Sequence, residues 1–216
     1  MSVELGYSDG SSVNLSAVPA KPVAVEGAWN VSFPEGWDAP ASVVFPRLVQ
    51  WDMHPDNGIK YFSGTGTYTR KVDLPQVLPG TRVMLDLGIV KNFAEVKVNG
   101  KGFPVLWKPP FRVDITDAIA KGAKSFDLEV KVTNLWPNRL IGDDVLYPED
   151  CEWSAKSRKG SKEIAIRGLP QWVKEGKASP TGRHTFTTWK HWSKEDDLLP
   201  SGLIGPVVLR FGELAH

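Results

Sequence analysis

Hydrophobic and polar residues alternate in short runs through the middle of the chain. The runs cover residues 68–74, 81–87, 93–98, 111–115 and 126–132. A period of two is typical of strands that bury one face, whereas an amphipathic helix repeats at about 3.6 residues. Turn-forming residues separate the runs, as in residues 75–80 with their two prolines and one glycine. We therefore expect a succession of short antiparallel strands with the spacing of a β-sandwich.

Turns and flanking runs extend this pattern. Asn99-Gly100 suits a tight type I′ turn, so residues 101–103 are expected to return as the second strand of a hairpin. Further strands are expected at residues 29–33, 183–189 and 206–211, and the last of these is expected to close the sheet. No window shows a helical period over ten or more residues, and 17 prolines recur along the chain, which predicts a low helix content.

The alternation predicts one all-β domain over residues 1–216, a β-sandwich, because 216 residues suffice for one large sandwich. Between residues 135 and 181 the alternation gives way to Pro, Trp, Gly and charged residues. This segment predicts a long irregular excursion, and a loop of this length in a compact domain indicates a functional or stabilising role.

Charge and cysteine content exclude several classes of function. The 26 basic and 25 acidic residues nearly cancel, so no overall field attracts nucleic acid. Cys151 is the one cysteine, which excludes an internal disulfide and a cysteine-rich zinc site. No stretch approaches the about 18 apolar residues of a membrane span, so no membrane partner is expected. Residues 1–10 lack the regions of a signal peptide, and we expect that the chain was trimmed from a longer parent.

Four segments together resemble one known family, and runs of this length are more specific than short motifs. They are residues 61–68 (YFSGTGTY), 106–116 (LWKPPFRVDIT), 134–143 (NLWPNRLIGD), and 185–189 (TFTTW) followed by 199–206 (LPSGLIGP). This set is similar to the C-terminal β-sandwich region of glycoside hydrolase family 106, whose members are α-L-rhamnosidases. More loosely, residues 110–116 and 132–134 resemble the sugar-binding jelly roll of glycoside hydrolase family 2. The resemblance covers roughly residues 28–212, where the core is expected, and implies a jelly-roll β-sandwich with a galactose-binding-domain-like fold.

The resemblance carries over no catalytic residue, because the family's barrel-like catalytic part is not contained in these 216 residues. It implies a non-catalytic carbohydrate-binding module of a rhamnosidase-like enzyme acting on plant or algal polysaccharide. Two alternatives stay open: a structural domain that packs on a catalytic barrel and has no sugar affinity, and, least favoured, a self-contained glycosidase or lyase. The expected partners are a polysaccharide containing rhamnose or uronic acid and the parent's catalytic domain. A secreted or periplasmic bacterial parent is expected.

Nine tryptophans suggest where a sugar would bind, because the C–H face of a sugar stacks on an indole ring. Trp107 and Trp136 stand out, since proline follows each within two residues and strand-end loops are expected there. Trp189 and Trp192 lie beside further hydrogen-bonding side chains, those of His184, Lys190 and His191. The alternative for each tryptophan is a place in the core, where most large aromatic residues of a sandwich lie.

A polar cluster surrounds Trp136 in the sequence. Its members are Asn134, Asn138, Arg139, Asp143 and Asp144. The planar guanidinium of Arg139 could hold a carboxylate or vicinal hydroxyls of a ligand. The favoured alternative is a buried Arg–Asp pair that pins the excursion onto the sandwich. We count Asn138, Arg139 and Asp143 as candidate ligand-binding residues.

The sequence offers no convincing catalytic or zinc site. Glycosidases need two carboxyl groups about 5 to 9.5 Å apart across a cleft, and neighbouring acids such as Asp143 and Asp144 point in opposite directions on an extended chain. Solvated turn acids explain such pairs better. No cofactor is expected except one structural calcium ion, for which an oxygen-rich group is a candidate: Asp52, Asp56 and Asn57. An ordinary turn is the alternative for this group.

One basic run, residues 156–162, could contact uronic-acid units of an anionic polysaccharide. A solvated loop is the favoured interpretation of such a run.

Overall fold

The computed structural model describes residues 2–6, 12–16, 21–75, 81–148, 152–158, 161–189 and 191–213. The predictions that involve Cys151, Lys190 and part of the basic run lie outside these residues. The elements, in chain order, are β1 (Ser2–Gly6), β2 (Ser12–Ser16), β3 (Val23–Ala24), β4 (Trp29–Ser32), β5 (Ser42–Phe45), η1 (Trp51–Met53), α1 (Asn57–Lys60), β6 (Thr65–Asp73), β7 (Thr81–Asp86), β8 (Ile89–Lys91), β9 (Phe93–Val98), β10 (Lys101–Gly102), β11 (Arg112–Asp114), η2 (Thr116–Ala118), β12 (Ser125–Thr133), α2 (Pro137–Leu146), β13 (Trp153–Arg158), β14 (Ser161–Ile166), α3 (Gln171–Lys174), β15 (Gly202–Gly205) and β16 (Val208–Glu213).

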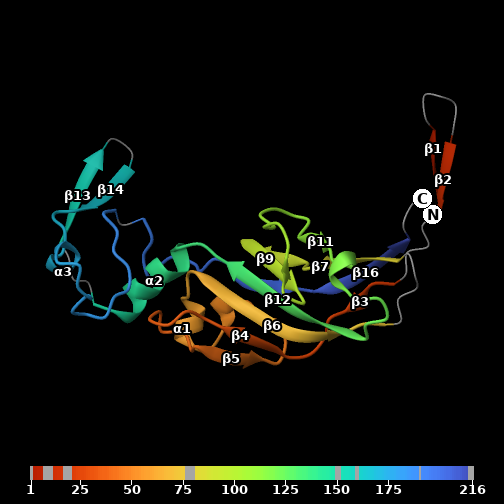
Figure 1. Cartoon of the computed structure of the whole chain (residues 1–216). Helices are drawn as coiled ribbons and strands as arrows, with labels where there is room; N and C mark the ends of the chain where they lie inside the picture. Colours follow the sequence, from red (N-terminus) through yellow and green to blue (C-terminus); the bar gives the residue numbers. More distant parts are fainter. Residues whose placement is uncertain are drawn as a thin grey trace.

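Two antiparallel sheets form the body of the molecule (Figure 1). The six-stranded sheet has the order β10-β9-β12-β6-β4-β5, and the four-stranded sheet has the order β11-β7-β16-β3. The remaining strands form three two-stranded pairs, β15-β8, β1-β2 and β13-β14. The predicted all-β sandwich with few helices is therefore confirmed. No helix among the described residues is long and apolar enough to cross a membrane.

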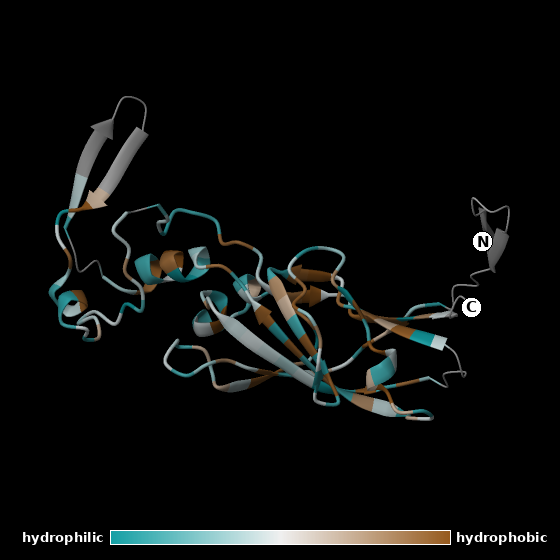
Figure 2. Cartoon of the chain, turned by 45° about the horizontal axis from the view of Figure 1, so that its top comes forward, coloured by the Kyte–Doolittle hydropathy of each residue, from teal (hydrophilic) through white to brown (hydrophobic). Residues whose placement is uncertain are grey.

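The core lies between the two sheets and follows from the alternation in the sequence. In β12, Phe126, Leu128, Val130 and Val132 are buried, while the residues between them face outward. Figure 2 shows the same alternation of hydrophobic and hydrophilic positions along the strands of the sandwich. Burying one such side chain stabilises the fold by about 1.5–3 kcal/mol, so the apolar rows hold the sheets together.

Most of the expected strands are present at the expected places. The predicted runs correspond to β6, β7, β9, β11 and β12, and residues 29–33 correspond to β4. Asn99 and Gly100 both have positive φ, at 50° and 82°, and β10 returns along β9 as predicted for a hairpin. A tight turn requires this left-handed backbone, which Asn and Gly adopt most readily.

Two strand predictions were wrong. Residues 183–189 form no strand and make one isolated bridge, between Trp189 and Ala165. The last strand, β16, does not close a sheet but lies between β7 and β3. It pairs with β7 over residues 208–213 and with β3 over residues 208–209, so both of its edges are hydrogen-bonded and it is a central strand.

The predicted irregular excursion is partly regular. It contains the ten-residue helix α2, the hairpin β13-β14 and the short helix α3. Together with the following loop it forms the lobe, which we define as residues 135–200; Figure 1 shows β13, β14 and α3 beyond α2, away from the sandwich. The described residues of the basic run, 156–158 and 161–162, belong to the strands of this hairpin rather than to a solvated loop.

Helix α2 forms despite a poor helical sequence. Pro137 occupies the first turn, where its missing N–H costs no hydrogen bond. Gly142 packs so closely on Tyr61 that an added Cβ would overlap that side chain. Ser63 Oγ donates to the carbonyl oxygen of Leu135 at 2.8 Å and accepts from the Arg139 N–H at 3.1 Å. Contacts with the sandwich, rather than helical propensity, therefore hold α2.

Trp51 is the largest side chain at the contact between β6 and β15. It is fully buried, and its indole N–H donates to Tyr68 Oη at 2.6 Å. The Leu203 N–H donates to the same hydroxyl at 3.1 Å, which ties β15 to β6. An added Cβ on Gly66 would lie 2.7 Å from the indole and one on Gly202 would lie 2.8 Å from it. The ring therefore fills the space between two glycines completely.

Candidate functional site

Three rings from distant segments meet at the start of α2. The ring centroid of Trp37 lies 5.7 Å from that of Trp136 and 5.7 Å from that of His184, and the Trp37 and His184 rings are inclined by 28°. Trp136 is 57% exposed, while Trp37 packs partly against the core. One indole is thus presented to solvent and is supported by rings behind it. We call this group, with Asp38 and Tyr147, the junction site.

Asp38 supplies the polar part of the junction site. Its Oδ2 accepts a hydrogen bond from Tyr147 Oη at 2.6 Å and lies 2.7 Å from His184 Nε2. Burial by itself would raise the pKa of Asp38, but the hydrogen bonds from Tyr147 and His184 and the positive charge of Arg139 outweigh it and lower the pKa. The hydrogen bond to Asp38, with burial, raises the pKa of Tyr147 to about 12. Asp38 is therefore an ionised acceptor, with 38% of its side chain exposed.

Beneath this surface lies a buried ion pair. Arg139 and Asp143 are both fully buried, and Arg139 Nη2 lies 2.8 Å from Asp143 Oδ1. Arg139 Nη1 lies 3.6 Å from Asp38 Oδ2, so the guanidinium is placed between two carboxylates. Thr185 N donates to Asp143 Oδ2 at 2.7 Å. Asp143 thus connects α2 with the loop before β15 inside the lobe, and Arg139 reaches the sandwich through Asp38, which is the buried Arg–Asp pair of the favoured interpretation.

The ion pair is close but poorly aligned. Within the described part of the chain, none of the side-chain nitrogens of Arg139 makes a well-directed hydrogen bond, although the charges lie within ion-pair range. Arg139 and Asp143 are therefore held together by the attraction of opposite charges in a buried environment. Asp143 is not a solvated turn acid, and that expectation was wrong because α2 turns the residue inward, onto Arg139.

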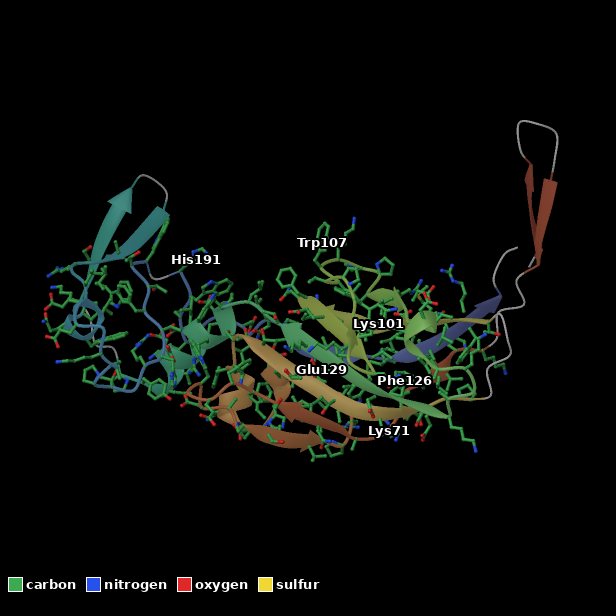
Figure 3. The ribbon with its side chains drawn as sticks, in the orientation of Figure 1. Lys71, Lys101, Trp107, Phe126, Glu129 and His191 are labelled. Atoms are coloured by element: carbon green, nitrogen blue, oxygen red, sulfur yellow. The ribbon has the colours of Figure 1, made fainter. Side chains whose placement is uncertain are left out.

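The other predicted ligand residues lie apart from the junction site. Trp107 is 64% exposed in the segment between β10 and β11, whereas His191 lies on the lobe, and Figure 3 shows the two well separated. Trp189 is 54% exposed and bridges to β14. The His191 and Trp192 rings contact each other edge to face, with centroids 5.4 Å apart. The structure thus brings Trp136 and His184 together but not the four remaining aromatic candidates.

Asn138 is buried on another side of α2. Its amide bonds both the N–H and the carbonyl oxygen of Leu199, each at 2.8 Å. It fixes the end of the lobe and does not reach the junction site.

Sequence reasoning missed Trp37, Asp38 and Tyr147. Trp37 and Asp38 lie in a loop of residues 34–40 that is rich in Pro and Gly, and Asp38 has a φ of 63°. A tryptophan next to a carboxylate in a loop is the usable signal in the sequence, because an indole and a polar group together suit ligand binding. Nothing local marks Tyr147, whose contact with Asp38 spans 109 positions.

The proposed calcium ligands have other partners. Asp52 Oδ1 accepts from the Ser201 N–H at 2.9 Å, and Asp56 Oδ1 caps α1 by accepting from the Gly58 N–H at 2.8 Å. Among the described residues no group of three His, Cys, Asp or Glu side chains could hold a metal ion. These bonds explain both carboxylates as structural acceptors, and calcium binding with Asn57 stays a prediction.

The junction site presents an exposed indole beside a partly exposed carboxylate and an imidazole. Stacking on Trp136 together with hydrogen bonds to Asp38 and His184 is a combination that orients sugars. A glycosidase needs a second reachable carboxyl group, and Asp143 is buried and paired with Arg139.

The comparisons with known proteins connect the chain to glycoside hydrolases. No protein-family model matches it. It is 45% identical over 195 residues to a Formosa agariphila protein named for an expected beta-glucuronidase activity, and the match covers 89% of this chain and 16% of that protein. The solved rhamnosidase from Novosphingobium sp. PP1Y is 33% identical with a TM-score of 0.67, over 92% of this chain and 16% of the other.

A more distant neighbour shows the fold alone. The β-D-glucuronidase of Dictyoglomus thermophilum is 19% identical with a TM-score of 0.51, and the match covers 89% of this chain and 28% of that one. The chain is a glycoside hydrolase-related β-sandwich domain. It spans only 16% of the length of the Formosa and Novosphingobium proteins.

Proposed function

We propose that this chain is a non-catalytic carbohydrate-binding domain of a larger, rhamnosidase-like enzyme of glycoside hydrolase family 106. The observation that carries the proposal is the exposed Trp136 indole beside the ionised Asp38 and His184. A sugar ring would stack on Trp136, and its hydroxyl groups would donate to Asp38. The relatives, named for rhamnosidase and beta-glucuronidase activities, favour a polysaccharide with rhamnose or uronic acid units.

Calorimetric titration of the 216-residue chain tests this proposal. The ligands are rhamnose, galactose, galacturonate and oligosaccharides from pectin and ulvan. We expect weak binding to at least one of them, reduced about threefold to tenfold by Trp136→Ala, since an aromatic contact is worth about 0.5–1.5 kcal/mol. Trp107→Ala, which removes an equally exposed indole far from the junction site, is the matched control and should change nothing. Flat titrations with every sugar would contradict the proposal.

A second function, packing on the parent's catalytic domain, is favoured by a separate apolar surface. Phe93, Val105 and Trp107 are 40%, 51% and 64% exposed. The bridge between Ala94 and Leu106 places Phe93 opposite Trp107 on the outer face. A contiguous group of exposed apolar side chains would suit contact with another domain. Under this second function the titrations would be flat, and the Trp107→Asp variant would no longer associate with the separately expressed remainder of the enzyme.

A further inference from the structure

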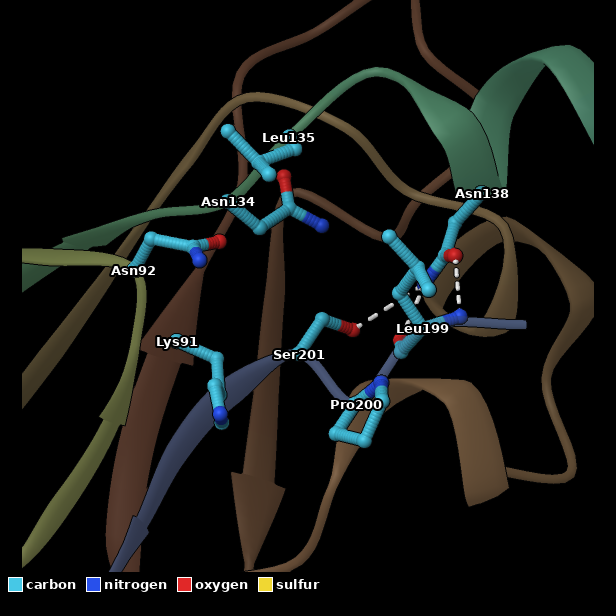
Figure 4. Close-up of a pocket in the computed structure, with 8 residues that line it drawn as sticks. All are labelled: Lys91, Asn92, Asn134, Leu135, Asn138, Leu199, Pro200 and Ser201. Atoms are coloured by element: carbon cyan, nitrogen blue, oxygen red, sulfur yellow. Dashed lines mark hydrogen bonds between the residues drawn. The ribbon is translucent and has the colours of Figure 1, made fainter.

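A second hollow lies on another side of the segment that carries Trp136. Its volume is about 150 Å³, and Figure 4 shows the residues that line it: Lys91, Asn92, Asn134, Leu135, Asn138, Leu199, Pro200 and Ser201. This is several times the ~30 Å³ of a water molecule and less than the ~300 Å³ where pockets for drug-sized ligands begin. The pocket therefore suits a single small unit rather than a long chain.

The rear of the pocket is a rigid frame. Asn134 donates to the Phe62 carbonyl oxygen at 2.8 Å and accepts from the Gly64 N–H at 2.9 Å. Asn138 is held by Leu199, as described above, and also donates to Ser201 Oγ at 3.4 Å. Both amides are buried, and in each the oxygen and the nitrogen take part in hydrogen bonds. They fix the shape of the pocket and are not needed as ligand contacts.

Two polar side chains of the pocket remain available. Lys91, at the end of β8, and Asn92, which follows it, have no side-chain hydrogen bond or ion pair with any described residue. Lys91 is the charged residue among the eight that line the pocket. The nearby carboxylate of Asp52 is engaged with the Ser201 N–H. The lining thus has a net positive charge and one free amide.

The apolar part of the lining complements these groups. Leu135 and Leu199 are 44% and 36% exposed, and Pro200 lies beside them. An ammonium group, an amide and an aliphatic wall together match a ligand with a carboxylate, hydroxyl groups and a C–H face. A neutral sugar would leave Lys91 without a partner.

We propose that this pocket binds one carboxylate-bearing sugar residue, a hexuronate, with Lys91 on the carboxylate and Asn92 on a hydroxyl group. The inference rests on the proposed carbohydrate-binding function and adds a second subsite, with its own ligand chemistry, to the junction site. Leu135 and Asn138 flank Trp136 in the sequence, so one short segment serves both subsites. The charge-assisted contact at Lys91 selects uronates over neutral hexoses.

Chemical-shift titration of the 216-residue chain with sodium glucuronate, with glucose as the neutral counterpart, tests the pocket. Glucuronate should bind about tenfold or more tightly than glucose, and added NaCl should weaken it. Lys91→Ala and Lys91→Gln should each lower the affinity for glucuronate about tenfold, whereas Lys91→Arg should retain most of it. Lys101→Ala, which removes an exposed lysine from β10, is the matched control and should have no effect. Urea unfolding of each variant verifies that it is folded.

The outcomes separate the two proposals. Equal binding of glucose and glucuronate, unchanged affinity in Lys91→Ala and Lys91→Gln, or equally tight binding of acetate would overturn the hexuronate pocket. If oligosaccharides still bind and their binding depends on Trp136, the proposed carbohydrate-binding function stands without the hexuronate pocket. Loss of glucuronate binding in Lys91→Ala and Lys91→Gln, while Lys91→Arg and Trp136→Ala keep it, supports the separate subsite.

Discussion

The sandwich and the lobe are held by different forces. The sandwich buries rows of apolar side chains between two sheets, with Trp29, Trp51 and Tyr68 among the largest. On α2, which attaches the lobe, the buried side chains are mostly polar: Asn138, Arg139, Ile141 and Asp143. The fold of the sandwich therefore depends on buried apolar surface, whereas the placement of the lobe depends on a few polar contacts of α2.

This difference has consequences for robustness. Apolar burial varies little with pH or salt, but ion pairs and charged hydrogen bonds vary with both. Substitutions in the sandwich should therefore lower the stability of the whole fold. Substitutions around α2 should displace the lobe first, and with it the junction site.

The largest expected effect is a loss of stability when Trp51 is removed from the core of the sandwich. Trp51→Ala should lower the free energy of unfolding by about 3–5 kcal/mol, because it leaves a large cavity and removes a hydrogen-bond partner of Tyr68. Urea unfolding followed by circular dichroism measures the change. Trp107→Ala removes an exposed indole, and its free energy of unfolding should stay within about 0.5 kcal/mol of that of the unsubstituted chain. Similar losses in both variants would remove the distinction between core and surface tryptophans.

The second largest effect is expected when the buried ion pair that helps to place the lobe is broken. Arg139→Met should leave Asp143 as an unpaired buried charge, a change that costs about 3–5 kcal/mol when the structure cannot relax. We expect part of this cost to be avoided by release of α2, seen as faster amide hydrogen exchange in α2 while β12 stays protected.

The double variant Arg139→Met/Asp143→Leu sharpens this test. It removes both charges and should restore most of the lost stability. If the double variant were no more stable than Arg139→Met, the buried charge would not be the cause of the loss.

The smallest expected effect concerns pH. Because the pKa of Asp38 is lower in the folded chain than in the unfolded chain, its contribution is present above about pH 4 and is lost as the pH falls through the folded pKa. The contribution should be below about 1 kcal/mol, since Asp38 is partly exposed. Urea unfolding at pH 7, 5, 4 and 3 should show that acid lowers the free energy of unfolding less in Asp38→Asn than in the unsubstituted chain. Asp117→Asn, outside this network, should leave the pH profile unchanged.

The sequence predicts the sandwich well because its strands carry their own signal. In β12 every second residue is buried, and the Asn99-Gly100 turn determines its own backbone geometry. Helix α2 could not be predicted in the same way. Pro137, Gly142 and adjacent acids argue against a helix locally, and the contacts that support it come from Tyr61 and Ser63, far away in the chain.

The candidate site was predictable only in part. Trp136 and His184 carry a visible signal, an aromatic or imidazole ring among polar neighbours in a loop. Their meeting with Asp38 depends on how the lobe folds back, and no local pattern encodes a contact across 146 positions. Lys91 and Asn92 likewise look like ordinary residues at a strand end until Leu199 and Ser201 close the pocket beside them.

The close fit of Trp51 between Gly66 and Gly202 also constrains how this domain can diverge. Neither glycine can gain a side chain while the indole is present, and Gly202 additionally has a φ of 94°. A smaller residue at position 51 would remove the closest contact at Gly66 and leave Phe33 Cε1, 3.1 Å from an added Cβ, as the next neighbour. Among homologues we therefore expect positions 51 and 66 to vary together, with alanine or serine at 66 found only where tryptophan is missing at 51.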